Sequence, residues 1–120
     1  MNRGTSCTTH GIGEWLAAAL VESEGVAVKR LFADAIPKVS STKGFTGHTL
    51  GASGGIESVL SVLTISEKCI FSNFGFEIPM PEHNIKPQKK FEGRMKVEHV
   101  MSNSFGFGGN CSSIIFSKSK

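Results

Sequence analysis

The sequence predicts an α/β fold, because two helix-like segments alternate with strand-like segments and the chain ends in two β-like stretches around a glycine-rich turn. The chain is 39% hydrophobic and contains 14 glycines. This composition is typical of one globular domain and argues against a disordered or fibrous chain.

Two segments are expected to be helices. Residues 15–32 are rich in Ala, Leu, Val and Glu and include apolar side chains for a buried face, although Gly25 could break this helix. A second helix is predicted from about Leu50 to Glu67, because four apolar residues recur there at helical spacing. The four residues, which we expect to face the core, are Ile56, Val59, Leu60 and Leu63.

Three segments are expected to be strands. Residues 38–42 are short and β-prone, which predicts a buried strand that leads into a turn at Lys43. Residues 97–105 and 111–117 are both β-like and flank the glycine-rich segment. The simplest arrangement is an antiparallel hairpin with residues 105–110 at its tip.

Charge and hydropathy argue against nucleic-acid and membrane binding. The net charge is +3, and the lysines are scattered apart from Lys86, Lys89 and Lys90, so no basic stripe suited to nucleic acid is present. The apolar runs are well short of the ~20 residues that a bilayer span needs, and the amino end has no apolar signal core. We therefore expect a soluble, cytoplasmic protein.

The three cysteines predict neither a disulfide framework nor a metal site. Cys7, Cys69 and Cys111 are widely spaced and lack a histidine at zinc-ligand distance, so free thiols are expected, with no metal and no cofactor. His10 follows Cys7 closely, but Cys/His pairs are normally assembled from distant parts of a chain. Cys7 is therefore expected to be an ordinary thiol in an irregular amino-terminal segment.

The most informative segment begins at Lys43, with His48 five residues later on the same turn. Residues 51–55 are all small, and Glu57 follows. Each glycine weakens a helix by up to ~1 kcal/mol relative to alanine, so we expect a backbone or a ligand to approach closely there. A second unusual segment, residues 103–110, lies near the carboxyl end.

These two segments carry a resemblance to a known family. Residues 40–48, with residues 51–54 and Glu57, resemble the Lys/His motif of elongating β-ketoacyl-acyl-carrier-protein synthases, which belong to the thiolase superfamily. Residues 103–109 resemble the carboxyl-terminal gating loop of that family. The resemblance runs from about Glu24 to Lys120 and covers only the carboxyl-terminal part of such enzymes.

The resemblance implies a fold and a domain boundary. The fold would be a partial thiolase-like layered α/β fold, with one mixed sheet, helices and a carboxyl-terminal β-hairpin. Residues 22–120 would form a partial carboxyl-terminal β-ketoacyl synthase domain, whereas residues 1–21 match the family poorly.

The implied chemistry is a decarboxylating Claisen condensation. By similarity, His48 would donate a hydrogen bond from a neutral imidazole to the malonyl thioester oxygen. A position just before a helix amino terminus should favour that neutral form. Lys43 would pair with Glu57, because a buried lysine needs such a partner. The alternatives are a helix-capping histidine, a solvated lysine and an exposed carboxylate.

The resemblance also implies substrate-binding residues. Phe107 would be the gate of the acyl pocket and its backbone N–H would contribute to the oxyanion hole, while Gly106 and Gly108 would let the loop move. Phe105 would support the gate; alternatively, both aromatic residues belong to a core at a tight turn. Thr46 would bind the phosphopantetheine arm or simply cap its own turn.

Two parts of the family's active site are missing from this sequence. No segment resembles the motif of the nucleophilic cysteine. The family's second histidine belongs to a His-Gly-Thr motif, which residues 3–6 imitate only superficially, with Arg3 in place of the histidine. Without the nucleophile the chain cannot form an acyl-enzyme, so we expect it to be inactive alone. It would act with acyl carrier protein and a complementing amino-terminal half. The alternative is a non-catalytic interaction or oligomerisation module, and in either case uncovered apolar faces predict a homo-oligomer.

Overall fold

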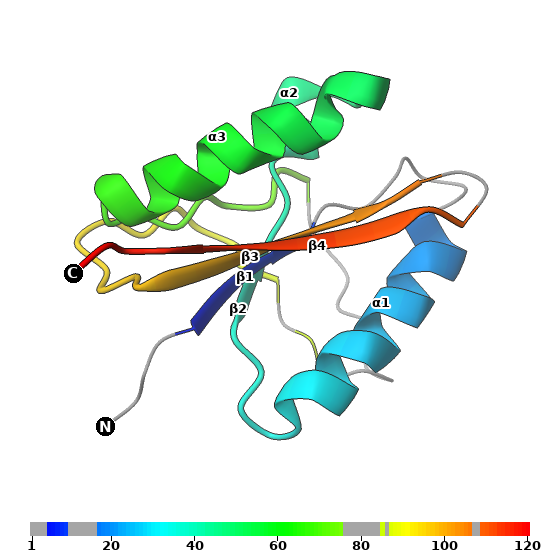
Figure 1. Ribbon diagram of the computed structural model, residues 1–120, viewed down its shortest axis with the longest axis horizontal. Helices are drawn as coiled ribbons and strands as arrows, with labels where there is room; N and C mark the ends of the chain where they lie inside the picture. Colours follow the sequence, from blue (N-terminus) through cyan, green and yellow to red (C-terminus); the bar gives the residue numbers. More distant parts are fainter. Residues whose placement is uncertain (1–4, 10–16, 76–84, 86, 107–108) are drawn as a thin grey trace.

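In the computed structural model, a central sheet separates two helical layers, with α3 on one face and α1 on the other (Figure 1). The structure describes residues 5–9, 17–75, 85, 87–106 and 109–120. Among these residues no helix is long and apolar enough to cross a bilayer.

The sheet has four strands in the order β2-β1-β3-β4. β1 (Thr5–Thr9) runs parallel to both β2 (Lys38–Ser40) and β3 (His99–Phe105). β3 and β4 (Cys111–Ser117) form an antiparallel hairpin. The predicted α/β fold with a mixed sheet and a terminal hairpin is confirmed, although β2 ends two residues before the expected boundary at residue 42.

β1 corrects the expectation of an irregular amino-terminal segment. Thr5–Thr9 lies in the middle of the sheet, and Cys7 is paired with Val39 on one side and Met101 on the other. The segment has no alternation of apolar and polar residues, so its sequence gives no periodic signal. A central strand receives its main-chain hydrogen bonds from both neighbours, and this pairing decides its conformation.

The helices follow the predicted order with small changes at their ends. α1 (Ala17–Phe32) continues through Gly25 without the expected break, because one glycine costs only about 1 kcal/mol in a long helix. α2 (Lys43–Thr46) is a single short turn. The second predicted helix begins as a 3₁₀ turn, η1 (Leu50–Ala52), and continues as α3 (Ser53–Ser66).

α3 faces the sheet with its polar side, so the predicted apolar core stripe is wrong at Val59 and Leu63, whereas Ile56 and Leu60 are half-buried. Glu57, Ser61 and Thr64 are at most 3% exposed, whereas Val59 is 60% exposed and Leu63 is 39% exposed. The buried hydroxyls are satisfied inside the helix: Ser61 Oγ donates to the Glu57 carbonyl at 2.8 Å, and Thr64 Oγ1 donates to a carbonyl one turn earlier at 3.0 Å. Burial of these small polar side chains therefore leaves no unpaired hydroxyl.

Among the residues whose side chains the structure describes, the buried apolar cluster is small and many large apolar side chains are exposed. Ile70, Val97 and Val100 form the buried cluster, and the half-buried Ile65 and Met95 pack against it. The exposed large apolar side chains are Val26, Leu31, Phe45, Leu50, Val59, Val62, Leu63, Phe74, Phe91, Ile114 and Ile115. Apolar surface of this extent is typical of a face that another polypeptide covers.

Candidate active site

The segment after β2 fixes the start of the site. Ser40 is buried, and its Oγ donates to the Phe71 carbonyl at 2.6 Å. The Ser41 N–H donates to Asn73 Oδ1 at 2.7 Å. These bonds anchor the chain to the neighbouring segment immediately before Lys43, so the position of Lys43 does not depend on a free loop.

α2 packs closely against the 71–75 segment. A Cβ at Gly44 would lie 2.8 Å from the Phe74 Cβ, which is closer than side chains tolerate. The rings of Phe45 and Phe74 have their centroids 5.3 Å apart. The close backbone approach that requires a glycine is therefore at Gly44.

The close backbone approach that was one of the two expectations for residues 51–55 is not found, and the approach of a ligand there stays a prediction. A Cβ at Gly54 would make an ordinary contact of 3.8 Å with Ser104 Oγ, and a Cβ at Gly51 or Gly55 would meet nothing within 4 Å. Small residues there leave open space beside the start of α3. Gly51 and Gly54 both line the cavity described below.

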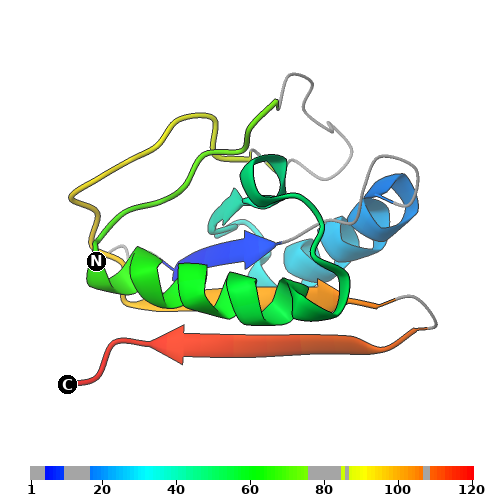
Figure 2. The same cartoon turned by 90° about the horizontal axis from the view of Figure 1, so that it is seen from above.

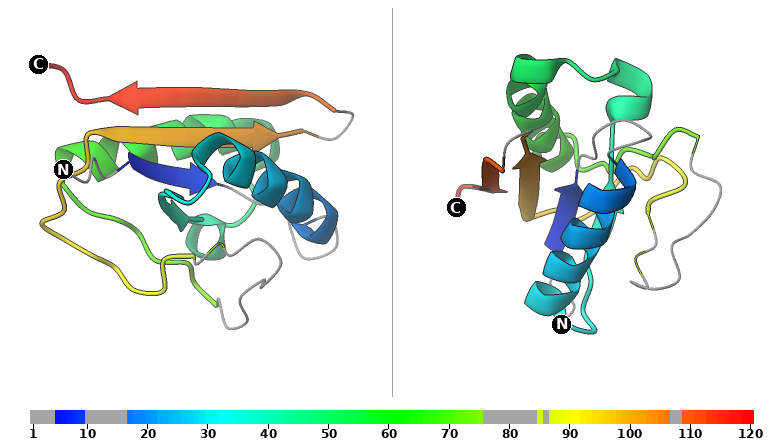
Figure 3. Two further views of the ribbon diagram at one scale, coloured as in Figure 1. Left: turned by 90° about the horizontal axis from the view of Figure 1, so that it is seen from below. Right: turned by 90° about the vertical axis from the view of Figure 1, so that its right-hand side faces the viewer.

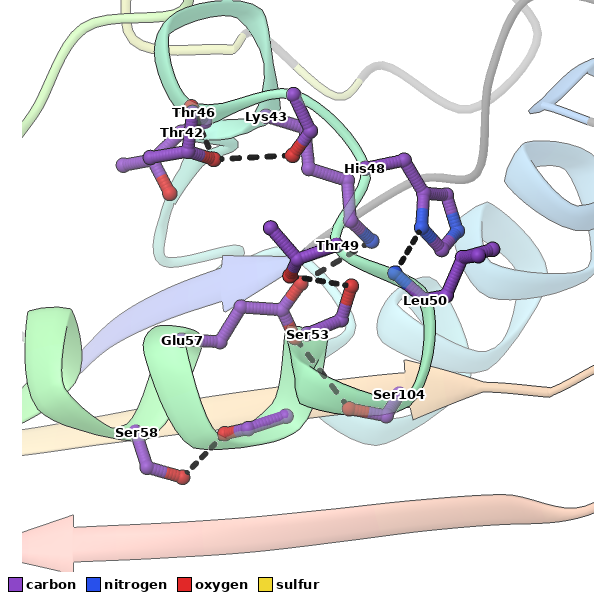
Figure 4. A network of polar contacts seen from close by, with 12 residues as sticks. Thr42, Lys43, Thr46, His48, Thr49, Leu50, Ser53, Glu57, Ser58 and Ser104 are labelled. Carbon is purple, nitrogen blue, oxygen red and sulfur yellow. Dashed lines mark hydrogen bonds and ion pairs between the residues drawn. The ribbon is translucent and has the colours of Figure 1, made fainter.

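Lys43 and Glu57 form a largely buried ion pair (Figure 4). Lys43 Nζ lies 3.1 Å from Glu57 Oε1, and the two side chains are 15% and 4% exposed. Ser104 Oγ donates to Glu57 Oε2 at 3.4 Å. The structure thus contains the pairing that the sequence predicted, in surroundings where either charge alone would be costly.

His48 lies exposed at the start of η1, with its ring directed toward the main chain of Leu50 (Figure 4). The Leu50 N–H donates to His48 Nδ1 at 2.9 Å. Because Nδ1 accepts this bond, the proton of the neutral ring is on Nε2, which is left as a donor. Leu50 has φ +51°, a left-handed backbone angle that is uncommon for a residue other than glycine.

One cavity of about 460 Å³ brings the predicted catalytic residues together with the hairpin end of β3. Lys43, His48 and Glu57 line it from the α2 and α3 side, and Phe105 and Gly106 line it from the other side. The remaining lining residues are Leu50, Gly51, Ser53, Gly54, Ser104 and Ser112. A histidine donor, a buried ion pair and a half-buried aromatic ring therefore share one space.

The hairpin tip is tight where the structure describes it. The Gly106 N–H donates to the Asn110 carbonyl at 2.7 Å, and a Cβ at Gly106 would lie 3.1 Å from that oxygen. Gly109 adopts φ +89°, a conformation that favours glycine. Phe107 and Gly108 lie outside the described residues, so the gate assigned to Phe107 and the freedom assigned to Gly108 stay predictions.

Thr46 is exposed and does not belong to the cavity lining. Its Oγ1 lies 3.3 Å from the Thr42 carbonyl and 3.1 Å from the Gly47 carbonyl, so its hydroxyl donates within its own turn. Of the two predicted roles, this geometry favours the turn cap. A contact with phosphopantetheine stays a prediction.

Glu24 is a second buried carboxyl that sequence reasoning missed. It is 6% exposed on α1, and burial raises its pKa to about 7, although a hydrogen bond from Asn103 and the charge of Lys43 lower it and the charge of Glu57 raises it. Its Oε1 has no hydrogen-bond partner among the described residues. The available signal was its spacing of four from Val28, which is buried on the same helix.

The described residues contain no group of three His, Cys, Asp or Glu side chains that could hold a metal ion. Cys69 is a buried free thiol and Cys111 an exposed one. Burial, and to a smaller extent the charge of Glu67, raises the pKa of Cys69. Neither thiol lines the cavity.

Comparisons with known families and proteins give matches to one family. Residues 8–77 match the family model of the β-ketoacyl synthase carboxyl-terminal domain. The chain is 40% identical over 97 residues to 3-oxoacyl-acyl-carrier-protein synthase 2 of Coxiella burnetii, which covers 79% of this chain and 23% of that protein. The synthase 2 of Staphylococcus aureus strain COL is 38% identical over 98 residues, covering 80% of this chain and 24% of that protein. The chain thus spans about a quarter of these relatives.

Solved structures share the fold. The ishigamide ketosynthase/chain length factor superposes with a TM-score of 0.85 at 20% identity, over 100% of this chain and 29% of that chain. A type II polyketide synthase ketosynthase, solved with its acyl-carrier protein and bound to the hexaketide, gives a TM-score of 0.84 at 21% identity, over 98% of this chain and 29% of that chain. The expected thiolase-like layered fold is confirmed. The domain boundary at residue 22 stays a prediction.

Proposed function

This chain belongs to the β-ketoacyl synthase family, and we propose that it supplies the enolate-stabilising part of a 3-oxoacyl-acyl-carrier-protein synthase site. The observation that carries this proposal is the position of His48. Its Nδ1 is occupied by the Leu50 N–H, and its ring lines the same cavity as the Lys43–Glu57 pair. The proposed setting is the cytoplasm, where thiols such as Cys111 stay reduced.

In the proposed reaction His48 Nε2–H donates to the thioester oxygen of a malonyl group. When the bond between the malonyl α-carbon and the carboxylate carbon breaks, carbon dioxide leaves. The electron pair of that bond stays on the α-carbon and forms an enolate, which places negative charge on the thioester oxygen. A donor fixed before the reaction needs no rearrangement as the charge develops. Removing one such donor typically costs about 10²–10³ in rate.

The Lys43–Glu57 pair is proposed to position the site and to set its charge. Glu57 holds the ammonium group of Lys43 at 3.1 Å, inside the cavity that His48 also lines. The ammonium would lend positive potential to the oxygen that becomes an enolate. Ser104 fixes the second carboxylate oxygen of Glu57 from β3, which ties the pair to the hairpin strand.

Acyl carrier protein is the proposed partner, with malonyl and acyl groups on phosphopantetheine. One structural relative was solved as a ketosynthase with its acyl-carrier protein. In this chain Phe105 and Gly106 border the cavity at the hairpin end, where the acyl chain would enter. By resemblance Phe107 would be the gate there, with Gly108 beside it.

A complementing amino-terminal half is proposed to supply the nucleophilic cysteine and the second histidine. Cys69 and Cys111 do not line the cavity, so neither is placed to hold an acyl group there. The outer side of α3 offers a surface for such a half, because Val59, Val62 and Leu63 are between 39% and 60% exposed. The polypeptide alone is therefore expected to lack condensing activity.

A second candidate function is a non-catalytic oligomerisation module. The exposed apolar side chains on α3 and β4 favour it, since these surfaces would serve assembly without any substrate. The two candidates differ in what His48 does: only the first requires a defined tautomer and a malonyl contact.

Nitrogen-15 NMR of the chain labelled at histidine tests the proposal. We expect His48 to be neutral with its proton on Nε2, and we expect its Nε2–H resonance to move when malonyl-pantetheine is added. His99 is exposed on β3 away from the cavity lining, so its resonance should stay unchanged. An Nδ1–H tautomer at His48 would remove the proposed donor, and an equal shift at His99 would show nonspecific binding.

A further inference from the structure

A second cavity lies at the carboxyl end of α3, whereas His48 precedes the amino end of this helix. Figures 2 and 3 show that the carboxyl end of α3, the start of β3 and the end of β4 lie at the same end of the molecule. The second cavity has a volume of about 760 Å³ and shares no lining residue with the cavity of His48. Its volume is within the range of small-molecule sites, which is about 300–1,000 Å³.

Apolar side chains from three segments line the second cavity. They come from α3, from the segment before β3 and from β4, and they are Val62, Ile65, Met95, Val97 and Phe116. Val97 belongs to the buried apolar cluster, and the half-buried Ile65 and Met95 pack against it. An alkyl chain in this cavity would remove apolar surface from water, which favours binding.

Four cationic side chains and one carboxylate line the same cavity. The cations are Lys68, Arg94, Lys96 and Lys118, and the carboxylate is Glu98. Lys96 Nζ lies 3.1 Å from Glu98 Oε1. Within the part of the chain that the structure describes, the other three cations have no carboxylate partner. The cavity therefore has an excess of positive charge beside its apolar lining, which attracts an anion.

Main-chain bonds between distant segments hold these cations beside the cavity. The Met95 N–H donates to the Lys68 carbonyl at 2.8 Å, which ties the residue after Arg94 to the end of α3. The Lys118 N–H donates to the Glu98 carbonyl at 2.9 Å, which ties the end of β4 to the start of β3. Lys68 and Arg94 have φ +53° and +59°, left-handed angles that persist in such residues only where the surrounding structure fixes them. The positions of the cationic residues are therefore set by the fold.

We propose that the second cavity binds an anionic amphiphile, namely an alkyl chain that ends in a carboxylate. The chain would lie against the apolar lining, and the carboxylate would lie at Lys68 and Arg94. A guanidinium group such as that of Arg94 can donate two parallel N–H bonds to one carboxylate. An uncharged apolar ligand would leave the cations without a partner, and a small anion would leave the apolar lining in water.

The second cavity is largely separate from the surface offered to a complementing half. Val62 belongs to both, whereas Val59 and Leu63 do not line the cavity. An acidic polypeptide segment is the competing occupant, but the cavity has the volume of a small-molecule site. This inference does not depend on the chemistry of His48, so each can fail without the other.

Nitrogen-15 NMR titration of the intact chain tests the ligand class. The three ligands are decanoate below its micellar concentration, decanol and acetate, which separate the effect of the charge from that of the alkyl chain. We expect decanoate to move the main-chain resonances of Met95 and Phe116 and to bind about tenfold more tightly than decanol, because only decanoate pairs with the cations. Acetate should not bind measurably. Equal affinity for decanoate and decanol, or decanoate shifts at His48 or Val59 instead, would overturn the proposal.

Two matched double variants test the cations. Lys68→Gln with Arg94→Gln should weaken decanoate binding about tenfold and leave decanol binding unchanged. Lys29→Gln with Arg30→Gln removes the same charge from exposed positions on α1, across the sheet from α3, and should bind decanoate as the wild type does. An unchanged affinity in the first variant, or an equal loss in the second, would contradict the proposal.

The salt dependence of the wild type serves if the first variant fails to fold. Added salt screens the charges, so it should weaken the binding of decanoate more than that of decanol. An affinity for decanoate that does not fall relative to decanol would also contradict the proposal.

Discussion

At the scale of single residues, one main-chain bond selects the chemistry available at His48. The Leu50 N–H occupies Nδ1, so the donor is Nε2–H. Sequence reasoning placed His48 correctly before a helix start but could not choose the nitrogen, because this choice depends on which main-chain N–H meets the imidazole ring in the folded chain. A φ of +51° is uncommon for leucine, and no pattern in the sequence indicates it.

The same limit explains the residues that were missed or only partly understood. The Lys43–Glu57 pair was expected from the resemblance to the family, and it agrees with the need of a buried lysine for a carboxylate partner. The burial of Glu24 was not predicted. Glu24 lies on α1, which is on the opposite face of the sheet from α3, and its hydrogen-bond partner Asn103 lies on a strand far away in the sequence. Contacts between residues that are far apart in the sequence cannot be predicted from a local sequence pattern.

Glu24 predicts a specific dependence of stability on pH. Its pKa is raised from 4.5 to about 7 in the folded protein, chiefly by burial. Between these values the folded state holds a proton that the unfolded state has released, so the free energy of unfolding falls as pH rises through this window and levels off above about 7. The shift corresponds to about 3 kcal/mol.

Glu24→Gln should remove this contribution because glutamine does not ionise. Urea denaturation at about pH 5 and about pH 8 measures it: the wild type should lose more stability between the two pH values than the variant. Glu67→Gln is the matched control, since Glu67 is exposed at the end of α3 and its variant should keep the wild-type pH dependence. An identical pH dependence in Glu24→Gln and wild type would contradict the burial argument.

At the scale of elements, α3 is a helix whose existence was predictable and whose orientation was not. Its apolar residues follow helical spacing, which predicts a helix but not the face that meets the sheet. Six of the fourteen residues of α3 are apolar, and the residues that it buries, Glu57, Ser61 and Thr64, are polar. The spacing of apolar residues therefore does not predict which face of α3 packs on the sheet.

Two adjacent substitutions in α3 test its orientation. Ser61 is 1% exposed against the sheet, so Ser61→Leu should overpack the interface and lower the free energy of unfolding by about 2 kcal/mol. Val62 is 50% exposed, so Val62→Ser should change the free energy of unfolding by less than about 1 kcal/mol in the isolated chain. Chemical denaturation measures both. The reverse order of effects would mean that the apolar side of α3 faces the sheet.

β1 shows the same limit in a strand. Its five residues are Thr5–Thr9, which carry no alternating apolar pattern, yet both of its edges are paired in the sheet. The hairpin of β3 and β4 was easier to predict because its strands are adjacent in the chain and flank a glycine-rich tip. Sequence reasoning therefore succeeded for local pairing and failed for a strand whose partners lie about 30 and 90 residues away.

At the scale of the whole molecule, the described residues bring the proposed site residues together in one cavity and leave large apolar side chains exposed. The cavity gathers Lys43, His48 and Glu57, while Val59, Val62 and Leu63 on the outer side of α3 are exposed. The matched part of this chain covers 23% and 24% of the two relatives.

Reconstitution with the amino-terminal three quarters of the Coxiella burnetii relative is the most direct test of the account. Decarboxylation of malonyl-carrier protein and formation of 3-oxoacyl product are measured for each part alone and for the mixture. We predict product only from the mixture, a loss of about 10²–10³-fold with His48→Ala, and wild-type turnover with His99→Ala. Turnover by this chain alone, or full activity of the His48→Ala mixture, would contradict the account.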